Sequence, residues 1–69
     1  MDKIQIISWF SPSLLDNTNY KHGDLIDGNE DKALEIAGEL FKSGLNVIIK
    51  RLGINGYCIA VSNVNFGQR

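Results

Sequence analysis

The chain has 69 residues, a formal net charge of −1, and 43% hydrophobic and 22% charged residues. This length leaves room for one small domain over residues 1–69, and the composition excludes the class of disordered chains. The near-zero charge provides no global field that would draw the chain onto nucleic acid or an anionic membrane. The apolar runs are too short to span a bilayer, and one cysteine with one histidine cannot build a disulfide or a structural zinc site.

The first segment, about residues 3–10, alternates in the manner of a β-strand. Ile4, Ile6 and Phe10 fall on one face of this strand, and Trp9 falls on the other. The pattern therefore predicts a first strand whose core face includes Phe10.

The connection over residues 11–28 is long for so small a domain, so it has to be functional or packed down. Ser11 and Pro12 suit the cap and first position of a single helical turn. The remainder is rich in Asn, Asp and Gly, which favour turns. Its apolar residues give it the means to pack: Leu14, Leu15, Tyr20, Leu25 and Ile26.

Residues 29–43 carry the strongest helical pattern. Asp27 or Asn29 can cap this helix, and Gly44 supplies the left-handed residue that ends it. The apolar side chains fall in one arc of the helix, which predicts an amphipathic helix lying on a flat partner. The residues expected on that arc are Ala33, Leu34, Ile36, Ala37, Leu40 and Phe41.

Two further strands are predicted at about residues 45–52 and 57–64, joined by a glycine-bounded hairpin link. The order β-α-β-β indicates an α+β fold, with one helix on one face of a three-stranded, mostly antiparallel sheet. A right-handed crossover through the helix makes the first two strands parallel. The third strand then fits between them, antiparallel to both, in spatial order 1-3-2; order 1-2-3 is the alternative.

One helix covers only one face of this sheet, and the other face is not that of an ordinary solvated sheet. A solvated face would be polar throughout, whereas this face carries several large apolar residues that would form an exposed patch if left bare. Three coverings stay open: the loop over residues 11–28, a second copy of the chain, or another macromolecule. The residues expected to bind a partner or to self-associate are Ile7, Trp9, Ile48, Lys50 and Leu52.

Carboxylates gather at the start of the helix and along its exposed face. Capping and the helix dipole explain most of the cluster at the N-terminus. Asp31, Glu35 and Glu39 stand one turn apart, a mildly repulsive spacing that is consistent with a surface for a basic partner. A simply solvated face is the alternative. The predicted acidic rim consists of Asp24, Asp27, Glu30, Asp31, Glu35 and Glu39.

His22 and Cys58 are the catalytic candidates of the chain. His22 with Asp24 has the residue types of a general base and its orienting acid, and Cys58 has the type of nucleophile that a histidine activates. No further catalytic group accompanies them in the sequence. A solvated loop histidine and an apolar strand cysteine are therefore the favoured interpretations, and we expect a non-enzyme without metal or cofactor.

The apolar spacing Ala33-x-x-Ile36-Ala37-x-x-Leu40, followed by Gly56-Tyr57-x-Ile59-x-Val61, resembles the first two-thirds of SPOR domains. That family has a βαββαβ fold and binds denuded peptidoglycan. The resemblance covers about residues 30–62 and implies a similar architecture. No binding residue of the family is carried over to this chain.

The leading expectation is a small protein-binding module in a reducing cytoplasm, a location favoured by the unpaired Cys58. In its specific form this would be a phage or mobile-element protein that inhibits a host factor, such as a defence nuclease complex. The acidic rim would then meet a basic, nucleic-acid-binding surface on that target. The alternatives are a nucleic-acid-binding module that uses Lys3, Trp9 and Lys50, and a homodimeric scaffold. No membrane partner is expected.

Overall fold

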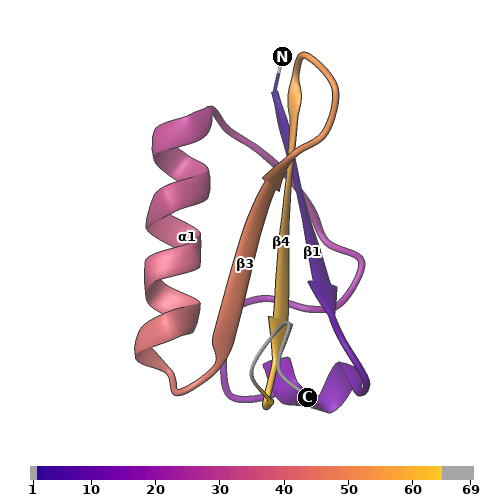
Figure 1. The fold of residues 1–69 in the computed structure, drawn as a ribbon, viewed down its shortest axis with the longest axis vertical. Helices are drawn as coiled ribbons and strands as arrows, with labels where there is room; N and C mark the ends of the chain where they lie inside the picture. Colours follow the sequence, from indigo (N-terminus) through magenta and orange to yellow (C-terminus); the bar gives the residue numbers. More distant parts are fainter. Residues whose placement is uncertain (1, 65–69) are drawn as a thin grey trace.

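The computed structural model describes residues 2–64 as an α+β fold with one α-helix beside a mixed sheet of four strands (Figure 1). The strands lie in the order β2-β1-β4-β3. In chain order the elements are β1 (Lys3–Ser8), the 3-10 helix η1 (Pro12–Leu15), β2 (Leu25–Asp27), α1 (Glu30–Lys42), β3 (Asn46–Arg51) and β4 (Gly56–Ser62). Along the described residues there is no helix with the length and hydropathy that a membrane crossing requires.

The order of the three long strands, β1-β4-β3, confirms the predicted order 1-3-2. The predicted count of three strands is wrong, and so are two predicted directions, since the first strand was expected to run parallel to residues 45–52 and antiparallel to residues 57–64. β2 is an additional edge strand, and β1 runs parallel to β4, with Ile6 beside Ile59. The cause is β2 itself, because the chain returns along β1 before the helix begins. The helix therefore runs in the direction of β1, and β3 then runs against β1 (Figure 1).

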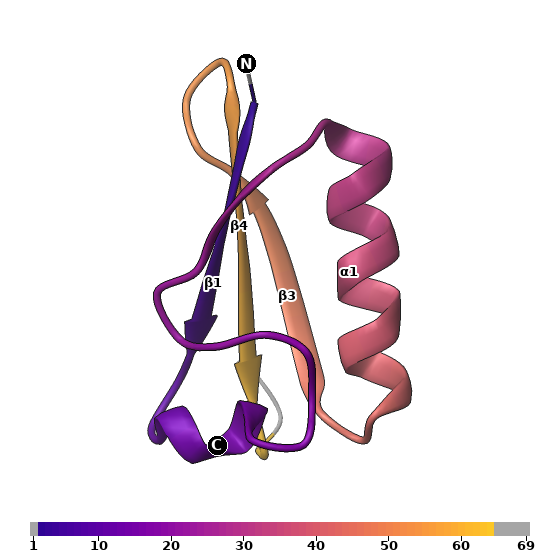
Figure 2. The ribbon, with the colours of Figure 1, turned by 180° about the vertical axis from the view of Figure 1, so that it is seen from behind.

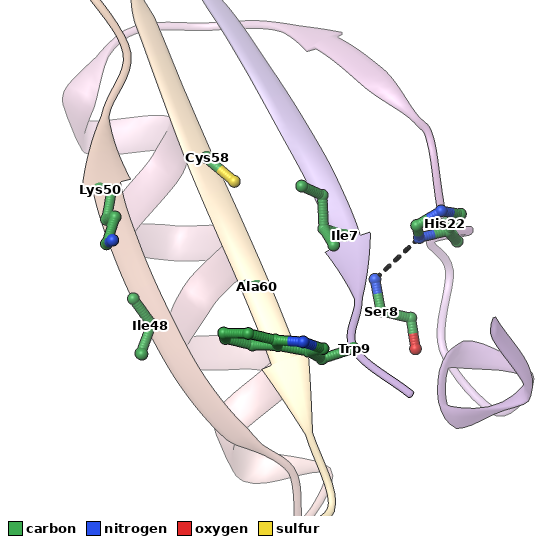
Figure 3. A pocket seen from close by; sticks show the side chains of 8 residues that line it. All are labelled: Ile7, Ser8, Trp9, His22, Ile48, Lys50, Cys58 and Ala60. Carbon is green, nitrogen blue, oxygen red and sulfur yellow. Dashed lines mark hydrogen bonds between the residues drawn. The ribbon is translucent and has the colours of Figure 1, made fainter. Parts of the chain in front are cut away.

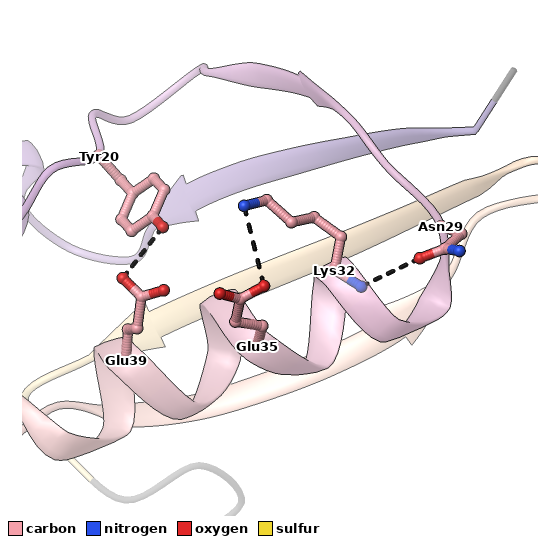
Figure 4. A network of polar contacts seen from close by, with 5 residues as sticks. All are labelled: Tyr20, Asn29, Lys32, Glu35 and Glu39. Carbon is pink, nitrogen blue, oxygen red and sulfur yellow. Dashed lines mark hydrogen bonds and ion pairs between the residues drawn. The ribbon is translucent and has the colours of Figure 1, made fainter.

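The ends of α1 follow the sequence closely. Asn29, rather than Asp27, caps the helix, and its side-chain oxygen accepts a 3.1 Å hydrogen bond from the backbone N–H of Lys32 (Figure 4). Gly44 has φ 100°, a left-handed conformation that a residue with a side chain rarely adopts. The predicted helix over residues 29–43 is confirmed to within one residue at each end.

The buried side of α1 is narrower than predicted. Leu34 is 52% exposed and Phe41 is 67% exposed, so these two do not belong to the core as expected. Leu34 lines a groove with Ile49 of β3, the edge strand, and Phe41 follows seven residues later, which places it on the same flank of the helix. The sheet ends before it reaches this flank, which leaves the two side chains uncovered.

The core lies between the sheet and α1 and is completed by the long loop on the same side. The course of the loop is seen in Figure 2. Its residues Tyr20 and Ile26 pack against the core, and the hydroxyl of Tyr20 donates to Glu39 of α1 at 3.2 Å (Figure 4). Loop 11–28 therefore finishes the helix side of the sheet, and the alternative in which it covers the opposite face is wrong. The fully buried apolar side chains are Ile4, Ile6, Leu15, Ala33, Ile36, Leu40, Ile59 and Val61.

The single helical turn predicted after the first strand is confirmed as η1. The hydroxyl of Ser11 accepts from the backbone N–H of Ser13, and Pro12 occupies the first position. The turn carries Leu15 into the core, where it is 2% exposed. This burial explains how a long loop remains packed in so small a domain.

Candidate functional site

The face of the sheet opposite α1, which we call the open face, contains a shallow apolar pocket of about 500 Å³ (Figure 3). Its floor is formed by side chains from the three long strands, and the Trp9 ring lies across it. The residues lining the pocket are Ile7, Ser8, Trp9, His22, Ile48, Lys50, Cys58 and Ala60. Four of the five residues expected on this face are therefore brought together, while Leu52 is not part of the pocket lining and is 45% exposed.

An aromatic pair stands at the end of β1, beside this pocket. The rings of Trp9 and Phe10 are stacked, with centroids 6.2 Å apart and planes 23° from parallel. Phe10 is 76% exposed and has φ 77°, a left-handed conformation for a residue that is not glycine. Its predicted place on the core face of the first strand is wrong, because β1 ends at Ser8 and the chain then turns. The turn directs Phe10 to solvent at a cost in backbone strain.

Charge on the open face is sparse. Lys3 faces Asp27 across β1 and β2, and the two form an ion pair. Leu25, opposite Gln5, adds another apolar side chain to this face and is 66% exposed. Of the residues that the structure describes, Lys50 is thus the cation that the open face offers to a ligand, at the β3 side of the pocket (Figure 3).

His22 reaches the pocket from the long loop but has a structural partner. The backbone N–H of Ser8 donates to Nδ1 of His22 at 3.0 Å (Figure 3). Asp24, the expected orienting acid, instead accepts from the backbone N–H of Lys21 at 2.8 Å. The pairing of His22 with Asp24, which the catalytic interpretation required, is therefore wrong. The imidazole of His22 instead completes the backbone hydrogen bonding at the end of β1.

Cys58 lies on the floor of the pocket, in the central strand β4. Burial raises the pKa of its thiol, and the charge of Lys50 offsets this only in part. A thiol whose pKa is raised forms less thiolate at neutral pH and is a weaker nucleophile. This agrees with the interpretation of Cys58 as an apolar strand residue.

Two members of the predicted acidic rim lie in the loop and in β2, before the helix begins. Asp24 is held in its turn by the Lys21 N–H, and Asp27 is paired with Lys3. The carboxylates are therefore engaged within the chain.

The helix carboxylates are also largely engaged. Glu35 lies 3.8 Å from Lys32, and Glu39 accepts the hydroxyl of Tyr20 (Figure 4). Burial, the charge of Glu39 and its hydrogen bond all raise the pKa of that tyrosine. Asp31 is exposed at the first turn. The outer face of α1 thus carries mixed charge with internal partners.

Glu30 lies on the flank of α1 that faces β3, together with Leu34, and not on the flank of Glu35 and Glu39. Its carboxylate lies 2.7 Å from the guanidinium of Arg51, which also stands over the Tyr57 ring at 6.0 Å. The hydrogen bond and charge of Glu30 raise the pKa of Arg51. Together with the Lys3–Asp27 pair, this contact uses two of the cations near the sheet, which leaves little positive charge for nucleic acid.

The described residues contain no group of three or more side chains that could hold a metal ion. Comparison with protein-family models finds no match, and searches of curated proteins and of solved structures find none either. The spacing shared with SPOR domains is therefore not accompanied by a family match. Within the described residues, the chemistry of the site is that of an apolar surface with an aromatic end and one free-standing lysine.

Proposed function

We propose that the chain is a non-enzymatic protein-binding module that docks through its open face. The observation that carries the proposal is the aromatic pair, since Phe10 holds a left-handed backbone conformation while 76% of its side chain is exposed. Strained residues of this kind persist where the surrounding structure holds them, and they cluster at ligand sites. The pair borders an apolar pocket of about 500 Å³, which is typical in size of a site that receives a side chain or small ligand.

The chemistry of the face favours a protein over a nucleic acid. A strand of nucleic acid needs several cations along its backbone as well as stacking aromatic rings. Here Lys3 is neutralised by Asp27 and Arg51 by Glu30, so among the described residues Lys50 is the one cation that lines the pocket with Trp9. Protein interfaces, in contrast, are rich in Trp and Phe and poor in charge at their centre.

The expected partner presents an apolar side chain with a carboxylate near it. The apolar group would enter between the Trp9 ring and Ile48, above Ala60, and the carboxylate would lie against Lys50. Aromatic anchors seated in such pockets contribute most of the binding energy of many interfaces. A carboxylate opposite Lys50 would set the orientation of the partner.

The acidic rim remains a prediction as a second contact surface. Its support is weaker than that of the open face, since Asp27, Glu30, Glu35 and Glu39 have partners within the chain. Phage origin, inhibition of a host defence factor and a cytoplasmic location also remain predictions. They rest on size and composition.

The test uses the tryptophan itself, because Trp9 is the one tryptophan of the chain and its fluorescence reports on the open face. The immobilised chain is used to capture proteins from the native host, and the captured protein is then titrated against the free chain. We expect a shift of Trp9 emission on binding. Trp9→Ser and Ile48→Lys should abolish capture, and circular dichroism verifies that each variant is folded.

Glu35→Lys is the matched control, because it alters the exposed helix face and leaves the pocket intact. Retention of the same partner by this variant supports the open face. If Glu35→Lys loses the partner while Trp9→Ser keeps it, the acidic rim is the binding surface and our proposal is wrong. Binding of single-stranded DNA that weakens with salt and requires Lys50 would establish the nucleic-acid alternative instead.

A further inference from the structure

The edge of the sheet at β3 has backbone groups that lie ready for pairing. β3 is the outermost strand, and the N–H of Leu52 donates to Gly56 of β4 at 2.8 Å. In an antiparallel strand, the backbone N–H and C=O groups of every second residue point toward the same neighbouring strand. Val47, Ile49 and Arg51 therefore direct their N–H and C=O groups away from β4, toward the free edge.

An apolar stripe accompanies this edge on the helix. Leu34 and Phe41 are seven residues apart, two turns along the same flank, and are 52% and 67% exposed. Leu34 and Ile49 line one shallow groove between α1 and β3, and Ile49 is 37% exposed. A strand edge that pairs with none of residues 2–64 on its outer side and an exposed helix flank thus form one continuous surface.

We propose that this surface joins two copies of the chain in a symmetric dimer, with their β3 strands paired antiparallel about a two-fold axis at Ile48. Facing residues of such a pair lie on the same face of the sheet, and side chains alternate between the faces along a strand. The numbers of two facing residues therefore differ by an even number, so the two-fold axis has to pass through a residue and not between two residues. With the axis at Ile48, Val47 pairs with Ile49 of the second copy through the outward backbone groups. Lys50 then faces Asn46 of the second copy, and no like charges are opposed.

The positions of the exposed helix residues indicate the same two-fold axis independently. β3 runs antiparallel to α1 (Figure 1), and the guanidinium of Arg51 contacts the carboxylate of Glu30 at 2.7 Å. One strand residue advances about 3.3 Å and one helix residue about 1.5 Å, so the three residues from Arg51 to Ile48 match about six or seven helix residues. Ile48 is therefore level with about residues 36–37, close to the midpoint between Leu34 and Phe41.

An axis at this height sets the two helices side by side and antiparallel on one face of the joined sheet. Leu34 of one copy faces Phe41 of the other, and the contact occurs twice. The first turn of each helix, with Asp31, lies near the last turn of the other, with Lys42. These charges attract, and the antiparallel helix dipoles agree with them.

A second copy fits better than a lone peptide strand. An added strand would pair with Val47 and Ile49 but would leave Leu34 and Phe41 exposed. A second copy covers the strand edge and the helix flank at once. The dimer would leave both open faces on one side of an eight-stranded sheet, so it goes beyond the binding function proposed above and does not depend on it.

Light scattering coupled to size exclusion tests the proposal. We expect the chain to have twice its 7.7 kDa mass and Phe41→Glu to be monomeric. Leu25→Glu is the matched control, since Leu25 is 66% exposed on β2 at the opposite edge, and this variant should remain dimeric. A chain that is monomeric at every concentration overturns the proposal, as does a dimer that survives Phe41→Glu.

A cross-link then tests the register, in a Cys58→Ala background that removes the native thiol. Two Ile48→Cys residues would face each other across the axis at a Cα separation of about 4.5 Å, which a disulfide spans. Lys50→Cys is the control, because its two copies lie on either side of the axis, each opposite Asn46. Oxidation should cross-link Ile48→Cys efficiently and Lys50→Cys poorly, and the reverse result contradicts the axis.

Discussion

The backbone N–H of Ser8 donates to Nδ1 of His22, so that a loop side chain takes the place of a neighbouring strand at the end of β1. β2 itself pairs only with Lys3 to Gln5. Beyond it, the N–H of Ile6 donates to Asp24, and the N–H of Gly23 donates to Ile6. The loop thus continues the pairing along β1 from the end of β2 to His22. The same imidazole borders the open-face pocket, so the loop both closes the sheet edge and shapes the candidate site.

Replacement of His22 by alanine should therefore lower stability. The Ser8 N–H would lose its acceptor, and Ser8 is only 6% exposed, which limits the water that can replace it. We expect a decrease of about 1 kcal/mol in the free energy of unfolding, measured by urea denaturation. His22→Gln retains a side-chain acceptor and should lose less. An equal loss in both variants would show that the hydrogen bond is not the cause.

Alkaline pH should weaken the contact between the loop and the helix. Burial, Glu39 and Glu35 raise the pKa of Tyr20 above its usual 10.0. Below pH 10 the contribution of Tyr20 to stability is fully present. As the pH rises above that value, the unfolded chain loses the phenolic proton first, so stability falls until the folded pKa is passed. Denaturation midpoints between neutral and alkaline pH should fall more steeply for the unsubstituted chain than for Tyr20→Phe. Identical slopes would contradict this assignment.

The helix, the three long strands and the order of those strands were predictable because they follow from local patterns. The Asn29 cap, Gly44 and the Ser11–Pro12 turn each act within a few residues, and hydrophobic alternation places the central strand. The parallel pairing of β1 with β4 was not predictable in this way. It depends on β2, whose three residues are too short to show alternation.

The candidate site was predictable only in part, for a similar reason. Ile7, Trp9 and Ile48 were found by alternation, since each lies within a regular strand or directly beside it. Phe10 was misplaced because a left-handed residue reverses the alternation, and no glycine or asparagine marks that turn. The Ser8–His22 hydrogen bond joins residues 14 positions apart through a loop, and loop geometry leaves no periodic signal.

Phe10→Gly should stabilise the fold while weakening partner binding. Glycine adopts φ 77° without the clash that a side chain meets, and Phe10 buries little, so we expect a gain of about 0.5–1 kcal/mol in unfolding free energy. Ile54→Gly is the control, as Ile54 is 96% exposed and is not among the positive-φ residues. It should be neutral or destabilising. A Phe10→Gly variant that is both less stable and equally active in binding would remove the role assigned to the aromatic pair.

Two glycines should respond in opposite directions to alanine, because the space beside them differs. A Cβ on Gly28 would lie 2.6 Å from Cγ and 2.8 Å from Cβ of Lys32 at the start of α1, so the helix or the loop has to shift. Gly38 lies within α1, and a Cβ there would meet nothing within 4 Å. We expect Gly28→Ala to lower the unfolding free energy by about 1–3 kcal/mol through overpacking. Gly38→Ala should raise it by about 1 kcal/mol, because alanine favours the helix. Urea denaturation at one fixed protein concentration measures both, and a stabilising Gly28→Ala would show that the approach of the loop to Lys32 is not close.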